Sequence, residues 1–92
     1  MDIIKYFQNW YISKCDGEWE HSYGFDIGTI DNPGWKVIIN GESNREPLVI
    51  NIDHGDDDWI IINADAIEFK GYCSPQNLFT ILKHAKKWID KH

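Results

Sequence analysis

Apolar residues near the N-terminus recur at the spacing of an amphipathic helix. Across residues 2–14 the apolar side chains repeat every three to four positions, which is the period of one helix face. Asp2 begins this segment, where a carboxylate interacts favourably with the helix dipole. The repeat stops at Asp16-Gly17, a turn-forming dipeptide. The sequence therefore predicts an N-terminal helix over residues 2–14.

A second apolar stripe marks the C-terminal part of the chain. Ser74 stands where an N-cap residue is expected, and Pro75 follows at the first helical position, where a missing N–H costs nothing. The apolar positions that follow are Leu78, Ile81, Leu82, Ala85, Trp88 and Ile89. Because they fall on one helix face, a second amphipathic helix is predicted from Ser74 onward.

Between the two helices the apolar period shortens to two residues, as in half-buried strands. The alternation predicts strands at residues 23–27, 35–39, 48–52 and 67–69, and a continuous apolar run at 59–62 predicts a central strand covered on both faces. Residues 31–34 form a predicted turn, in which Pro33 fixes φ and Gly34 is free to take a positive φ. Connections of hairpin length cannot make parallel crossovers. The predicted fold class is therefore α+β: an antiparallel meander of about five strands with both helices packed on one face.

Length and composition limit the class of protein. With 92 residues the chain has room for one domain, predicted to span 1–92, and its five Trp, four Tyr and four Phe supply a compact core. No apolar run reaches the roughly 18 residues that a membrane span needs, and the N-terminus lacks a signal-peptide pattern. Cys15 and Cys73 are too few for a disulfide scaffold. We expect a cytoplasmic protein with two reduced thiols and no membrane partner.

Charge is distributed unevenly along the chain. The net charge is −6, but residues 16–68 hold thirteen acids and two bases, while lysines dominate both flanks. Such a field repels nucleic acid and attracts a basic partner. Acidic composition also serves solubility alone, so charge by itself adds little to the case for binding.

The segment 15–21 carries the most reactive residue types in the chain. Cys15, Glu20 and His21 define an alternative function, a small metal- or cysteine-dependent enzyme. Against it, the chain has neither a CxxC nor an HxxxH spacing, so we predict no metal, no cofactor and no catalytic residue. Cys73 precedes a helix start, where a thiolate is stabilised, but a buried structural cysteine is the commoner case.

Two stretches of the sequence are similar to a known family. They are Cys15-Asp16-Gly17-Glu18-Trp19-Glu20-His21 and Asp31-Asn32-Pro33-Gly34-Trp35. In this order and spacing they closely resemble the immunity protein 53 family of bacterial polymorphic toxin systems. Asp58-Trp59 and the C-terminal helix resemble the same family, whereas residues 41–57 match little of it.

The resemblance implies a cytoplasmic antitoxin of bacteria that binds the C-terminal domain of a cognate toxin and neutralises it. For the contact surface we predict acidic and aromatic loop residues, namely Asp16, Glu18, Trp19, Glu20, Asp56, Asp57 and Asp58. Trp19 has an alternative role in capping the helix–strand junction, and the whole of 15–21 has an alternative role as a structural junction. A general acidic adaptor is a further alternative, which a neighbouring toxin gene would distinguish.

Overall fold

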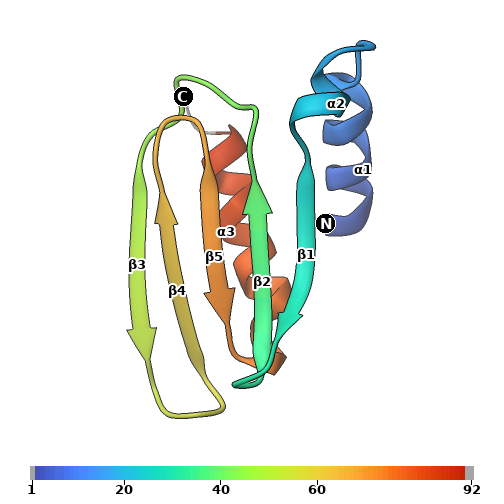
Figure 1. Ribbon diagram of the computed structural model, residues 1–92. Helices are drawn as coiled ribbons and strands as arrows, with labels where there is room; N and C mark the ends of the chain where they lie inside the picture. Colours follow the sequence, from blue (N-terminus) through green and yellow to red (C-terminus); the bar gives the residue numbers. More distant parts are fainter. Residues whose placement is uncertain (1, 91–92) are drawn as a thin grey trace.

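The computed structural model describes residues 2–90, which form one five-stranded sheet with helices on one side (Figure 1). The helices are α1 (Ile3–Lys14), α2 (Trp19–Ser22), the 3-10 turn η1 (Pro75–Asn77) and α3 (Leu78–Asp90). The strands are β1 (Phe25–Ile30), β2 (Gly34–Ile39), β3 (Leu48–Asp53), β4 (Trp59–Ala64) and β5 (Phe69–Cys73). The predicted α+β class, the five strands and the two terminal helices are confirmed.

All strand pairs are antiparallel, but the strand order is β1-β2-β5-β4-β3 rather than that of a simple meander. The connection between β2 and β3, residues 40–47, crosses the end of the sheet, and the backbone N–H of Arg45 donates to the carbonyl oxygen of Ala66 in the β4–β5 turn (Figure 1). Because this connection is longer than a hairpin turn, β3 does not have to pair with β2. β5 returns into the space between β2 and β4.

One face of the sheet carries the core. α3 lies behind β5 and β2 in Figure 1, and α1 lies beside β1. The Phe7 ring of α1 stacks on Phe25 of β1 with centroids 4.7 Å apart, and the Tyr6 hydroxyl donates to Asp90 Oδ1 of α3 at 2.7 Å. The apolar stripe predicted for the C-terminal helix is confirmed, since five of its six residues are buried and Leu78 is partly buried. Both helices therefore cover the same face.

The N-terminal helix begins as predicted. The Asp2 side chain accepts a hydrogen bond from the backbone N–H of Lys5 at 3.0 Å, which caps the first turn. At the other helix start, Ser74 is the N-cap and Pro75 the first residue of η1, but the Ser74 hydroxyl makes no capping bond. Instead it accepts from the Trp59 backbone N–H and the Asn77 amide.

Two local predictions are wrong, and the predicted turn at 31–34 is present but without a positive φ at Gly34. The fifth strand starts at Phe69, because Asp65 Oδ1 accepts the backbone N–H groups of Ile67 and Glu68 and holds that segment in a turn. Gly34 does not adopt a positive φ; it is needed because a Cβ there would collide with the carbonyl oxygen of Cys73. The run 59–62 is covered on one face only, so Ile61 remains 44% exposed.

Candidate protein-binding surface

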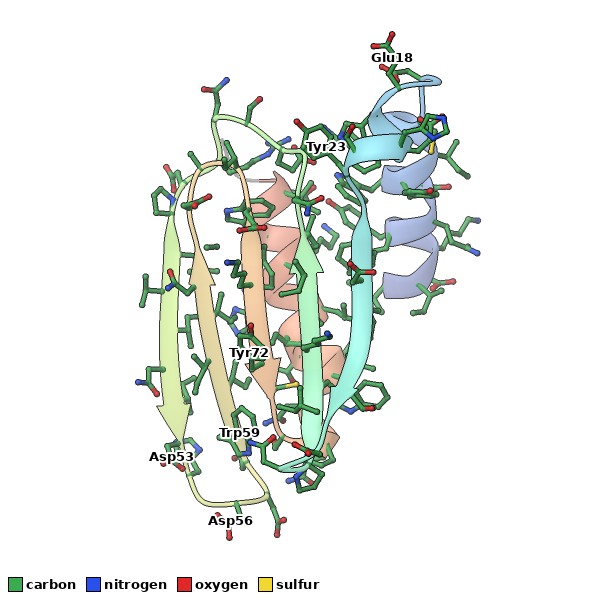
Figure 2. All side chains as sticks on the ribbon, viewed as in Figure 1. Glu18, Tyr23, Asp53, Asp56, Trp59 and Tyr72 are labelled. Carbon is green, nitrogen blue, oxygen red and sulfur yellow. The ribbon has the colours of Figure 1, made fainter. Side chains whose placement is uncertain are left out.

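The seven predicted contact residues form two groups at opposite ends of the sheet. Figure 2 shows Glu18 at the end near α1 and Asp56 at the tip of the β3–β4 hairpin. The first group lies between α1 and β1, and the second lies in the loop that joins β3 to β4. The structure therefore does not bring the two groups together into one patch.

In the first group, the Asp16 and Glu20 carboxylates accept hydrogen bonds from the backbone of their own turn. Asp16 Oδ1 accepts the backbone N–H groups of Glu18 and Trp19 at 2.9 Å each. Glu20 in return accepts the N–H groups of Asp16 and Gly17 at 2.9–3.1 Å. These reciprocal bonds start the helix α2, which the sequence did not predict. They also explain why much of the 15–21 motif is structural.

Hydrogen bonding also fixes the charge of these carboxylates. Backbone N–H groups, first those of Trp19 and Glu18, hold the pKa of Asp16 below its ordinary value. The pKa of Glu20 is lowered in the same way, first by its own backbone N–H and then by those of Asp16 and Gly17. Both side chains are therefore ionised at neutral pH, and their main partners are within the turn.

Trp19 closes the junction between α1 and the sheet. Its indole packs edge-on against Trp10 with centroids 5.6 Å apart, and its Nε1–H donates to the carbonyl oxygen of Gly41 at 3.1 Å. Gly41 has a φ of 85°, and a Cβ there would collide with this indole. The capping role that the sequence left open for Trp19 accounts for its position, whereas Glu18 and His21 beside it are exposed.

In the second group Asp58 is also held in place. Its Oδ1 accepts from the Asn77 side chain at 3.0 Å, and its Oδ2 lies 3.1 Å from His54 Nδ1. These contacts, first that of Asn77, lower the pKa of Asp58. The neighbouring Gln76 amide donates to the Asp57 carbonyl oxygen, so hydrogen bonds join the loop to η1. The side chains of Asp56 and Asp57 remain exposed to solvent.

Sequence reasoning missed Glu42, a buried carboxylate between α1 and the β2–β3 connection. Its side chain is 1% exposed and accepts from Trp10 Nε1 at 2.5 Å, Lys14 Nζ at 3.2 Å and Arg45 Nη2 at 2.7 Å. Burial raises its pKa, but the hydrogen bonds from Arg45, Trp10 and Lys14 outweigh burial and leave the pKa lowered. No sequence pattern identifies Glu42, because two of its partners are distant in the chain. Trp10 is 32 residues away and Lys14 is 28 residues away, and only Arg45 is near, at three residues.

The sheet face opposite the helices carries large apolar side chains that are exposed or half-buried. Strand alternation places on this face Ile38, Val49, Trp59, Ile61 and Tyr72. Val49 is 76% exposed and Ile61 is 44% exposed. Trp59 and Tyr72 point toward the viewer in Figure 2, with α3 behind the sheet. We name this set the uncovered face; Val49 and Ile61 are exposed and the other three are half-buried. Apolar side chains that gather on an accessible surface are typical of a protein contact.

Of the residues of the alternative enzyme, Glu20 accepts backbone N–H groups of its own turn, and His21 is exposed. Cys15 is exposed, and Cys73 is fully buried, where burial raises the pKa of its thiol to about 11. Cys73 is therefore protonated at neutral pH and unsuited to nucleophilic attack. Across residues 2–90 no three His, Cys, Asp or Glu side chains group closely enough to hold a metal ion. No helix within the same residues is long and apolar enough to cross a membrane.

The fold and the uncovered face define a small α+β protein that presents one bare side of an antiparallel sheet. Residues 4–90 match the family described as Immunity protein 53, which is nearly the whole chain. The chain therefore belongs to the immunity protein 53 family, as the motifs of its sequence predicted. No curated protein and no solved structure shows significant similarity to it.

Proposed function

We propose that this protein is an antitoxin that binds a cognate toxin domain in the bacterial cytoplasm and neutralises it by contact rather than by catalysis. Membership of the family over residues 4–90 supports a toxin as the partner. The match covers both terminal helices and every strand, so it applies to the whole fold.

The toxin contact is proposed to lie on the β3–β4 side of the sheet, and one observation supports this location. Residues 46–69 include seven acids and no Lys or Arg, and they contain β3 and β4, which carry Val49, Trp59 and Ile61 of the uncovered face. An acidic surface with exposed apolar side chains suits a toxin domain with a basic surface. Opposite charge speeds the encounter, and the apolar side chains add affinity once the surfaces meet.

Co-expression tests the proposal directly. The C-terminal domain of the toxin encoded beside this gene is induced in bacterial cells with and without the present protein. We expect the toxin domain alone to arrest growth and the pair to grow normally. The matched control is a toxin domain from an unrelated locus, which the protein should not neutralise. Growth arrest by the cognate domain in the presence of well-expressed protein would contradict the proposal.

A further inference from the structure

Trp59 differs from the other four tryptophans in how its indole N–H is used. Trp10, Trp19, Trp35 and Trp88 each donate this N–H to a protein acceptor, at distances of 2.5–3.1 Å. Among the described residues 2–90, Trp59 is the tryptophan whose indole N–H has no protein acceptor. Tryptophans that are amphipathic and half-exposed commonly use this group at interfaces. The unused donor therefore points to a partner at this position.

Trp59 lines a pocket on the uncovered face. The pocket has a volume of about 240 Å³, and its lining includes Asn32, Asn51, Asp53, Asp56, Trp59 and Ile61. Asp53 is directly opposite Trp59 in the β3–β4 ladder, so the carboxylate and the indole lie on the same face about one strand spacing apart. Figure 2 shows Asp53, Asp56 and Trp59 together at the lower end of the sheet.

The carboxylates of this pocket are not neutralised within the protein. Asp53 Oδ1 accepts only the backbone N–H of Gly55, at 3.0 Å, which leaves its second oxygen open. Within residues 2–90, no ion pair involves Asp53 or Asp56. Two basic residues of the described strands share this face: Lys70 of β5 pairs with Glu68 at 3.4 Å, and Lys36 of β2 lies against Gly28 of β1. The pocket therefore combines an aromatic wall with two carboxylates that have no cation.

We propose that this pocket receives an arginine side chain of the toxin. The inference rests on the proposed function, since it names the feature of the toxin that the acidic side recognises. A guanidinium is planar, stacks on an indole and donates several parallel hydrogen bonds to carboxylates. Asp53, Asp56 and the Asn51 amide supply acceptors around the Trp59 ring, while the free indole N–H pairs with an acceptor next to the arginine. Phosphate groups would be repelled by the same carboxylates, which argues against nucleic acid as the occupant.

Calorimetric titration with the purified toxin domain encoded beside this gene tests the proposal. We expect Trp59→Ala to weaken binding about 30-fold or more, the level of an interface hot spot. The double variant Asp53→Asn/Asp56→Asn, which keeps the shape of both side chains, is expected to weaken binding by a similar factor. The matched control is Asp26→Asn, which removes one charge from the same sheet face on β1, and it should change affinity less than about threefold.

The possible outcomes distinguish a failure of the pocket proposal from a failure of the proposed function. If the unmodified protein binds and neither set of pocket variants weakens binding, the pocket proposal is overturned while the proposed function stands. Weakening by Trp59→Ala alone, with the double aspartate variant unchanged, overturns the arginine as the occupant. If the unmodified protein does not bind, the proposed function itself fails. To separate loss of binding from loss of folding, Trp59→Phe and the aspartate variant are measured beside Trp59→Ala, with equal melting temperatures as the criterion of folding.

Discussion

Trp10 donates its indole N–H to Glu42 Oε1 across 2.5 Å, joining α1 to the connection between β2 and β3. The same carboxylate pairs with Lys14 and Arg45, whose side chains are 28% and 15% exposed. One buried acid therefore fixes both the first helix and the crossing that gives the sheet its order. We therefore expect the stability of the fold and the position of β3 to depend on this contact.

Replacement of Glu42 tests that dependence. We expect Glu42→Ala to lower the free energy of unfolding by about 2 kcal/mol, because the Trp10 N–H loses its acceptor and two cations lose their partner. Urea denaturation followed by tryptophan fluorescence measures the change. Glu18→Ala, at an exposed position, is the control and should shift stability by less than about 0.5 kcal/mol. Equal stability of the two variants would contradict the account.

The contribution of Glu42 should also depend on pH. Its pKa is lower in the folded protein than the ordinary value of 4.5, so the folded state holds the proton less tightly than the unfolded state. The stabilisation is therefore complete above that ordinary value and is lost as the pH falls through the lower, folded pKa. We expect the difference in unfolding free energy between the unmodified protein and Glu42→Gln to shrink between pH 7 and pH 3. A difference that grows on acidification would refute this assignment.

The two cysteines should differ sharply in reactivity. Cys15 is exposed, whereas Cys73 is fully buried with a pKa raised to about 11, so only Cys15 is accessible to a thiol reagent. We expect one thiol per chain to react promptly with Ellman's reagent at pH 8 and the second only after denaturation. Cys15→Ser should abolish the prompt reaction. Two fast thiols in the native protein would mean that Cys73 is not in the core.

The two acidic groups predicted from the sequence can be separated by charge reversal. We expect Asp56→Lys/Asp57→Lys to weaken toxin binding at least about tenfold, mainly through slower association, because these exposed side chains lie on the acidic side. Asp58 is left unchanged, since its hydrogen bond to Asn77 supports the fold. Glu18→Lys tests the opposite end of the sheet and should have a smaller effect. Surface plasmon resonance at low salt measures the association and dissociation rates. A larger effect at Glu18 than at Asp56 and Asp57 would indicate that the toxin contacts the α1–β1 end instead.

The elements with strong periodicity could be predicted from the sequence. The stripe from Leu78 to Ile89 has the period of a helix, and its residues pack as that period requires. The strand order could not be predicted, because it depends on how residues 40–47 cross the sheet and not on any local pattern. Pairing of distant segments is a property of tertiary packing, which the alternation of side chains does not encode.

For the candidate site, too, local sequence patterns did not reveal what depends on tertiary packing. The motif around Asp16 and Glu20 looked reactive because it is rich in polar residue types, but those groups satisfy the backbone of a turn. The apolar run at 59–62 suggested a strand covered on both faces, because the half-buried Trp59 and the exposed Ile61 have the same residue types as a core strand. Apolar side chains on an uncovered sheet face have the same local pattern as those of a core strand, so only the position of the helices distinguishes the two cases.

The most direct test of the central claim is the affinity of the unmodified protein for its neighbouring toxin domain, measured by calorimetry at low and at high salt. The account predicts a dissociation constant below about 10 nM at low salt that rises markedly with salt, because the acidic side of the sheet contributes to the contact. Absence of binding at both salt concentrations would contradict the claim that this immunity protein acts by binding that toxin.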